Sequence, residues 1–161
     1  MRRAAEKLGD VESAAASVAV WRAAGHRVVL ANGVFDLLHV GHVRYLEDAR
    51  AQGDRLIVAI NGDVATARLK GAGRPVLPAS ERAVLVAALR CVDAVVVFEE
   101  PTADSILERL APHVHAKGTD YRVESVPERA TAERQGVRTV ITGDAKQHSS
   151  RELVERIREL L

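Results

Sequence analysis

Short apolar runs alternate with amphipathic segments along the chain, and this alternation is the feature that most restricts its fold. Segments with apolar residues at helical spacing cover 3–24, 39–52, 80–90, 102–110, 127–135 and 149–161. The continuous apolar runs between them, typical of buried strands, cover 27–31, 54–60, 94–98, 113–116 and 138–142. Strands that alternate with helices predict a sheet of parallel strands joined by right-handed crossovers.

We therefore expect an α/β fold, namely a Rossmann-like, doubly wound, five-stranded parallel sheet with helices on both faces. A length of 161 residues suits one domain with its own core, so residues 1–161 are expected to form a single domain. Residues 1–24 are expected to be an amino-terminal helical extension that packs on the rest of this domain.

Composition narrows the classes of function. The net charge of +1 provides no basic field, so a nucleic-acid partner is not expected. No apolar run approaches the length of a membrane span and no signal peptide opens the chain, so we expect a cytoplasmic protein without a membrane partner. The single cysteine, Cys91, is expected to be a small buried hydrophobic residue. The patterns GxGxxG and GxxxxGK[ST] are both missing, which argues against a dinucleotide oxidoreductase and a P-loop enzyme.

One strand-to-helix junction carries most of the candidate chemistry. The apolar run that ends at Ala31 passes through a polar, glycine-containing turn directly into a helix. His39 and His42 are three residues apart, so they lie on one face of this helix, and Gly41 between them lets a ligand approach the backbone. The free N–H groups of a first helical turn attract anions. Together these features predict a binding site for a polyphosphate.

Polar segments follow the other strands as well, and ligands of doubly wound sheets bind beyond the carboxyl ends of the strands. The polar loop expected over 67–75 carries Lys70 and Arg74 among glycines, so it could close over phosphates after substrate enters. The last helix opens with Ser149, whose spacing from Glu152 matches a capping box. The N–H groups of that helix would form a second anion site.

The histidine junction also resembles a known signature. The pattern Gly33-x-Phe35-Asp36-x-x-His39-x-Gly41-His42 is similar to the HxGH motif of the nucleotidyltransferase superfamily, in its cytidylyltransferase-like branch. The sequence of residues 32–46 most resembles that of the adenylyltransferase domain that makes ADP-heptose from heptose 1-phosphate. Residues 69–75 resemble a flexible loop of the same branch, and residues 117–121 resemble its KGGDY segment.

This resemblance implies an enzyme that transfers AMP from ATP to a sugar 1-phosphate, expected to be heptose 1-phosphate, and releases pyrophosphate. It implies Mg²⁺ held mainly by substrate phosphates. It further implies that the partners are a nucleotide and a sugar phosphate, with a separate sugar kinase upstream, and it leaves a homodimer open.

The resemblance also implies a role for each matching residue. The catalytic residues would be His39, His42, Lys70 and Arg82. The nucleotide-binding residues would be Asn32, Gly33, Val34, Phe35, His39, Gly41, His42, Lys117, Asp120, Ser149 and Ser150. The substrate-binding residues would be Asp36, Asn61 and Arg74. No protein ligand for a metal is expected, because no cysteine or third histidine lies near the histidine pair in sequence.

Two positions depart from the family pattern. Thr119 replaces the second glycine of the KGGDY segment, which leaves the shape of that loop open. The sequence His148-Ser149-Ser150-Arg151 is a variant of a serine- and threonine-rich signature that binds triphosphate. This variant weakens any inference about the choice of substrate.

Other interpretations stay open at the level of sequence. The alternative function is a cytidylyltransferase that uses CTP with glycerol 3-phosphate or ethanolamine phosphate. A nucleotide-binding protein without catalysis is a lower-ranked alternative. Arg82 could equally be a helix-surface residue paired with Glu81 or Glu12, and Asp36 could hold its turn through backbone N–H groups. The histidines expected to be structural are His26, His113 and His115.

Overall fold

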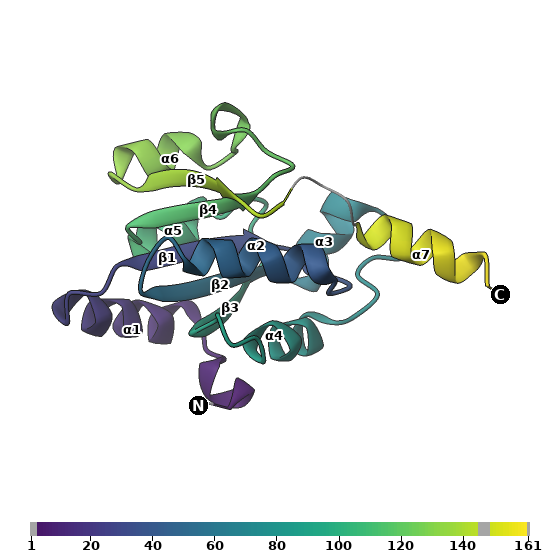
Figure 1. The fold of residues 1–161 in the computed structure, drawn as a ribbon, viewed down its shortest axis with the longest axis horizontal. Coiled ribbons are helices and arrows are strands. Elements are labelled where there is room, and N and C mark those ends of the chain that lie inside the picture. Colours follow the sequence, from purple (N-terminus) through teal and green to yellow (C-terminus); the bar gives the residue numbers. More distant parts are fainter. Residues whose placement is uncertain (1–2, 145–148, 161) are drawn as a thin grey trace.

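The computed structural model describes residues 3–144 and 149–160 (Figure 1). The strands are β1 (Val28–Gly33), β2 (Arg55–Asn61), β3 (Ala94–Phe98), β4 (Val114–Gly118) and β5 (Arg138–Thr142). The α-helices are α1 (Val11–Ala23), α2 (Val40–Arg50), α3 (Asp63–Lys70), α4 (Ala79–Ala87), α5 (Asp104–Leu110), α6 (Arg129–Arg134) and α7 (Ser150–Arg158). Two 3-10 helices are η1 (Ala4–Lys7) and η2 (Val123–Ser125). Each predicted strand is present within two residues of its expected bounds.

The sheet is parallel throughout, with the strand order β3-β2-β1-β4-β5. The chain places β2 and β3 on one side of β1 and then crosses to β4 on the other side. The predicted doubly wound α/β fold is thereby confirmed. Because strand order reverses between β1 and β4, the carboxyl ends of these two strands form the switch point at which such folds bind ligands.

Both faces of the sheet are buried, which explains why the strands read as continuous apolar runs. Along β1, Val29 and Ala31 belong to one core cluster, whereas Val28 and Leu30 belong to the other. The first cluster is covered by α2 and α4, and the second by α1, α5 and α6. Successive side chains of the central strand thus point to opposite faces of the sheet and pack into two separate core layers.

The amino-terminal segment is not the single helix that the sequence predicted. After η1, Leu8 pairs in parallel with Val95 of β3, and the Gly9 N–H donates to the Val95 carbonyl at 3.1 Å. Asp10 then begins α1 as its N-cap, with its side chain accepting from the Ser13 N–H at 2.8 Å. This short pairing to the edge strand splits the predicted helix in two. The helix α1 still packs on the sheet, as expected for the extension.

The polar loop expected over 67–75 also begins later than predicted, because α3 extends to Lys70. Gly71 and Gly73 follow with φ angles of 92° and 80°, which glycine adopts without the penalty that other residues meet. Lys70 therefore sits at the carboxyl end of a helix, exposed to solvent, just before two left-handed glycine positions.

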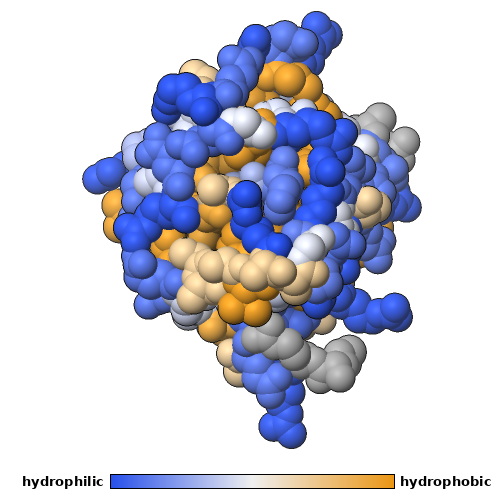
Figure 2. Space-filling view, turned by 90° about the vertical axis from the view of Figure 1, so that its left-hand side faces the viewer, coloured by the Kyte–Doolittle hydropathy of each residue, from blue (hydrophilic) through white to orange (hydrophobic). Residues whose placement is uncertain are grey.

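The two ends of the sheet differ in what they expose. Figure 2 faces the end at which the strands begin, where hydrophilic residues surround a patch of hydrophobic ones. The candidate segments leave the strands at the opposite end, where α3 and α7 lie (Figure 1). None of the described helices is long and apolar enough to cross a membrane. Residues 145–148 and 161, which belong to the predicted last loop and helix, lie outside the described residues.

Candidate active site

The turn between β1 and α2 is held in an uncommon backbone conformation. Phe35 has a φ of 51°, in the left-handed region that a bulky residue seldom occupies. Its buried ring lies against His42, with ring centroids 5.2 Å apart, and stacks on Tyr45 at 6.2 Å. Gly33 leaves room for this ring, because a Cβ there would lie 3.1 Å from Phe35 Cε2. The turn thus places an apolar support directly beneath the second histidine.

The two histidines of the motif form a stacked pair at the start of α2. His39 is the N-cap residue, and its ring lies 3.9 Å from that of His42, centroid to centroid, with 24° between the planes. The His39 backbone N–H donates to His42 Nδ1 at 3.4 Å. An Nδ1 that accepts a hydrogen bond leaves the proton of a neutral imidazole on Nε2. His42 therefore presents an Nε2–H donor at the head of the helix.

The surroundings of His42 keep its ring neutral. Burial lowers the pKa of His42 from 6.5 to about 4, and the neighbouring His39 and Lys70 add to the effect. Asp120 acts in the opposite direction but is the smallest contribution. Because their charges act on His42, Lys70 of α3 and Asp120 after β4 belong to the same site. A neutral donor and an exposed cation are then available to the same ligand.

Asp36 and Arg74, both predicted to bind substrate, contact each other. Arg74 Nη1 donates to Asp36 Oδ2 at 2.6 Å, and Asp36 Oδ1 accepts from the N–H groups of Val76 and Leu77 at 2.7 and 3.1 Å. Burial opposes ionisation of Asp36, yet Arg74 and the two N–H groups hold its pKa below the ordinary value. Asp36 therefore fixes backbone N–H groups, as the alternative interpretation suggested. These N–H groups belong to the segment before α4, and not to the turn that contains Asp36.

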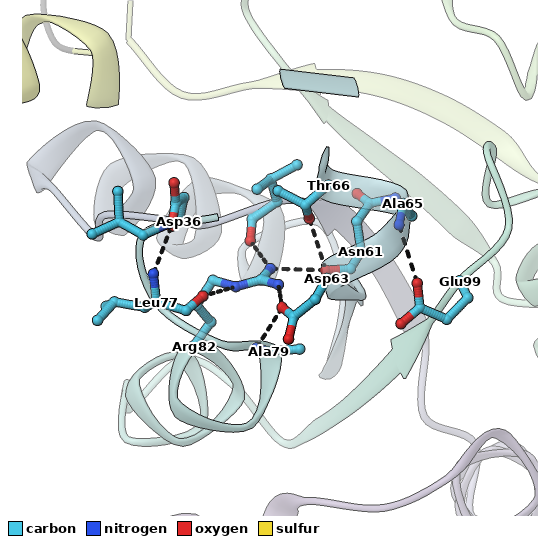
Figure 3. Close-up of polar contacts among 11 residues, drawn as sticks. Asp36, Asn61, Asp63, Ala65, Thr66, Leu77, Ala79, Arg82 and Glu99 are labelled. Atoms are coloured by element: carbon cyan, nitrogen blue, oxygen red, sulfur yellow. Dashed lines mark hydrogen bonds and ion pairs between the residues drawn. The ribbon is translucent and has the colours of Figure 1, made fainter. Parts of the chain in front are cut away.

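Arg82, predicted to clamp a phosphate, is a buried anchor in this structure (Figure 3). Its side chain is 0% exposed, and its guanidinium donates to the carbonyls of Leu77, Val34 and Asn61 at 2.9, 2.6 and 2.8 Å. The remaining partner is Asp63, at 2.8 Å. With these donors occupied inside the protein, the side chain joins the ends of β1 and β2 to the start of α4. The alternative pairing with Glu81 or Glu12 is wrong, because Asp63 is the ion-pair partner of Arg82. The contact of Arg82 with a phosphate stays a prediction.

The end of β2 is tied into the same region (Figure 3). Asn61, predicted to bind substrate, is buried, and its backbone carbonyl also accepts from Thr66 Oγ1 at 3.2 Å. Glu99, just after β3, accepts from the Ala65 N–H at 3.1 Å and so supports the first turn of α3. Gly62 is needed here, because a Cβ would collide with the Glu99 carboxylate. These contacts hold α3, and with it Lys70, at the carboxyl edge.

A buried polar cluster lies where β1 and β4 end. Asn32 Oδ1 is 2.8 Å from His115 Nε2 and 3.3 Å from Lys117 Nζ. Lys117 also pairs with Glu128 Oε2 at 3.3 Å, and Glu128 Oε1 accepts from the Ala103 N–H at 3.1 Å. Lys117, a predicted nucleotide-binding residue, is only 5% exposed. No local sequence pattern points to Glu128, because its partners, Lys117 and the Ala103 N–H, lie on two other segments.

The loops after β4 and β5 are joined by the residue that departs from the family pattern. Thr119 Oγ1 donates to the carbonyl of Asp144 at 2.8 Å, and Asp144 pairs with Arg44 of α2 at 2.9 Å. The extra side chain therefore links two loops at the carboxyl edge. Thr119 therefore has a structural contact in this chain.

The predicted capping box at the start of α7 is confirmed. Ser149 Oγ accepts from the Glu152 N–H at 3.1 Å, and the Glu152 carboxylate accepts from the Ser149 N–H at 3.2 Å. Ser150 Oγ donates to the Leu37 carbonyl at 3.3 Å, which brings the start of α7 to the histidine junction. His148 lies outside the described residues.

Among residues 3–144 and 149–160, no group of three His, Cys, Asp or Glu side chains could hold a metal ion. Mg²⁺ commonly keeps several waters and binds through substrate phosphates with one or two carboxylates. The donor groups of this site, namely imidazole N–H, ammonium and helix N–H, suit the phosphate oxygens themselves.

Comparison with known proteins places this geometry in a family. A family model described as cytidylyltransferase-like matches residues 30–156, from β1 into α7. The chain belongs to the cytidylyltransferase-like family. The crystal structure of the lipopolysaccharide core biosynthesis protein from Thermoplasma volcanium is 27% identical, with a TM-score of 0.66, and the match covers 76% of this chain and all of that one.

Curated relatives resemble the chain more closely in sequence. The bifunctional protein HldE of Geotalea uraniireducens is 43% identical over 152 residues, which are 94% of this chain and 31% of that protein. The bifunctional protein HldE of Pseudomonas paraeruginosa is 46% identical over 138 residues, which are 86% of this chain and 29% of that protein. The chain thus spans about three tenths of the length of these relatives.

Proposed function

We propose that this cytidylyltransferase-like chain transfers AMP from ATP to a sugar 1-phosphate, with heptose 1-phosphate as the expected acceptor, and releases pyrophosphate. The observation that carries the proposal is the stacked His39–His42 pair at the start of α2, in which His42 is held neutral and faces the same site as Lys70. The likeness of residues 32–46 to ADP-heptose-forming domains and the identity with HldE proteins support this choice of substrates.

The reaction needs little proton transfer. An oxygen of the sugar phosphate, already anionic, attacks the α-phosphorus of ATP, the bond from this phosphorus to the bridging oxygen of the β-phosphate breaks, and pyrophosphate leaves with the electron pair. Positioning and neutralisation of charge then provide most of the acceleration. A site of imidazole N–H groups, a helix N-terminus and lysine fits this demand, because each donates to phosphate oxygens without a general base.

Each residue of the site has a role in this proposal. His42 donates its Nε2–H to the phosphate oxygens on which charge builds as pyrophosphate leaves, and His39 lies beside it. Lys70, whose side chain is exposed at the end of α3, donates to the phosphates after ATP and its bound Mg²⁺ enter. Asp36 and Arg74 hold in place the segment that precedes α4. Arg82 acts indirectly, by holding the strand ends in place.

The acceptor must come from another reaction. The relatives named bifunctional are about three times as long as the segment they share with this chain. A sugar 1-phosphate is made by phosphorylating a sugar, so the proposal requires a sugar kinase activity to supply it.

The family description keeps CTP as the alternative nucleotide. Pyrophosphate release is therefore measured with Mg²⁺ while ATP and CTP are crossed with heptose 1-phosphate, glycerol 3-phosphate and ethanolamine phosphate. Release with ATP and heptose 1-phosphate alone supports the proposal. Release only with CTP and a polyol or amino-alcohol phosphate would keep the site and the reaction type but replace both substrates.

A further inference from the structure

The polar cluster beneath the ends of β1 and β4 is too buried to be an ordinary surface network. Lys117, Glu128 and His115 are 5%, 2% and 0% exposed, and the lysine and the glutamate form an ion pair at 3.3 Å. Removing two charges from water costs several kcal/mol each, so a buried pair is weak evidence for stability alone. Its position at the switch point of the sheet suggests that it serves the site instead.

The cluster fixes the orientation of the Asn32 carboxamide. An ammonium group has only donors, so the Asn32 atom 3.3 Å from Lys117 Nζ is the oxygen. His115 Nε2, at 2.8 Å, must then donate to the same oxygen, and its Nδ1 carries the lone pair. Nδ1 is buried without a hydrogen-bond partner among the described residues, as suits a neutral ring. With its oxygen held inward, Asn32 turns its NH₂ group away from the cluster, at the carboxyl end of β1.

Glu128 keeps Lys117 protonated and thereby keeps the Asn32 carboxamide in one orientation. Burial lowers the pKa of the Lys117 ammonium, and the carboxylate of Glu128 offsets part of this effect. Glu128 itself is held in place by the Ala103 N–H at 3.1 Å. If Lys117 lost its proton, its amine could accept a hydrogen bond, and the Asn32 carboxamide could then turn its NH₂ group inward. The charge on Glu128 therefore determines which end of Asn32 faces the site.

We propose that Glu128 is a positioning residue, which acts through Lys117 to hold the Asn32 NH₂ group as a hydrogen-bond donor to an oxygen of the nucleotide substrate. This inference rests on the proposed function, since it assumes a nucleotide at the carboxyl end of β1. It assigns the two buried charges a role in substrate binding in addition to their packing.

A double-mutant cycle tests the proposal. Glu128→Gln keeps the shape and an acceptor for the Ala103 N–H but removes the charge, and we expect kcat/KM to fall roughly 10- to 100-fold. Asn32→Ala should cause a similar loss, and the double variant should be no worse than Asn32→Ala within about threefold, because both changes remove the same donor. Losses that multiply, or a Glu128→Gln variant as active as wild type, would overturn the proposal.

Two further variants separate positioning from folding. Asn32→Asp keeps an acceptor for His115 and Lys117 and removes only the NH₂ group, so we expect it to lose as much activity as Asn32→Ala while its Tm stays within a few degrees of wild type. An Asn32→Asp variant with wild-type activity would contradict the proposal. Glu124→Gln, an exposed glutamate in η2, is the matched control and should retain full activity.

The same double-mutant cycle is repeated with the Kd for ATP, measured by calorimetric titration in the presence of Mg²⁺. This measurement needs no acceptor. If wild type binds ATP but does not turn it over with heptose 1-phosphate, the proposed substrates fail while the cycle in Kd still tests the positioning role. Coupled effects of Glu128→Gln and Asn32→Ala on Kd would support the role of Glu128. Independent effects would contradict it, whatever the acceptor is.

Discussion

The imidazole rings of His39 and His42 lie face to face, with their centroids 3.9 Å apart and 24° between their planes. Two charged rings could not stack so closely in a buried position without a large cost, so the arrangement requires that at least one ring is neutral. The lowered pKa of His42, about 4, meets this requirement. The pair is thus preorganised to donate hydrogen bonds near neutral pH, and its most direct consequences concern His42.

Replacing His42 by alanine should abolish most turnover while the fold survives. Loss of one preorganised donor to a developing negative charge lowers kcat by about 10²–10³-fold. The same result is expected for His39→Ala, and His42→Gln should retain part of the activity because its amide can replace the Nε2–H. Steady-state kinetics with circular dichroism check this, with His26→Ala as a control at the other end of the sheet. Near wild-type turnover in both alanine variants would contradict the assignment.

The free energy of unfolding should depend on pH through His42. Its pKa is about 4 in the folded chain and about 6.5 in the unfolded chain, so between these values the unfolded chain binds more protons. The contribution of His42 to stability is therefore complete above about pH 6.5 and is lost as the pH falls toward 4. Urea unfolding across this range should show a slope about 1.4 kcal/mol per pH unit smaller in His42→Ala than in wild type. Equal slopes would mean that His42 is not held neutral.

Arg82→Met should destabilise the protein strongly. The change leaves the carbonyls of Val34, Asn61 and Leu77 without their buried donor, which costs about 3 kcal/mol or more. For a chain of this length we expect Tm to fall by roughly 6–12 °C. Arg90→Ala, an exposed arginine at the far end of the same segment, should change Tm by less than about 2 °C. If Arg82→Met keeps its Tm and only loses activity, Arg82 binds substrate directly, as first predicted.

Lys70→Ala, unlike Arg82→Met, should lower activity while it leaves stability nearly unchanged. Lys70 is exposed at the end of α3, so its removal should leave the free energy of unfolding within about 0.5 kcal/mol of wild type. Loss of its charge from the phosphates should lower kcat/KM by about 10- to 100-fold. Arg68→Ala, on the exposed surface of the same helix, is the control and should have little effect. Equal effects of the two substitutions would indicate a general contribution of positive charge and not a specific contact.

The parts of the fold that could be predicted from sequence are those decided by local patterns. Continuous apolar runs mark the strands, because both faces of the sheet are buried, and the Ser149 capping box marks the start of α7. The splitting of the amino-terminal helix could not be predicted, since it depends on the pairing of Leu8 with a strand almost ninety residues away, at Val95. Helix α3 was not predicted either, and its first turn is supported by Glu99, which follows β3.

The candidate site likewise has parts that local sequence predicts and parts that only tertiary contacts decide. The histidine pair and its helix are local, so the sequence placed them well. The surroundings of Arg82 and Lys117 are not local, because their partners come from several loops that meet only in the folded chain. An arginine or lysine in a family motif therefore suggests contact with phosphate, although tertiary contacts can turn it inward. Burial of the side chain distinguishes the two cases, and a sequence pattern does not contain it.

The central claim is best tested by identifying the products. Purified chain is incubated with ATP, heptose 1-phosphate and Mg²⁺, and the mixture is analysed by ³¹P NMR and mass spectrometry beside a His42→Ala sample. Our account predicts a nucleoside diphosphate sugar and pyrophosphate in equal amounts with wild type, and initial rates of both at least about 100-fold lower with His42→Ala. Formation of ADP without a nucleotide sugar, or equal product from both samples, would contradict it.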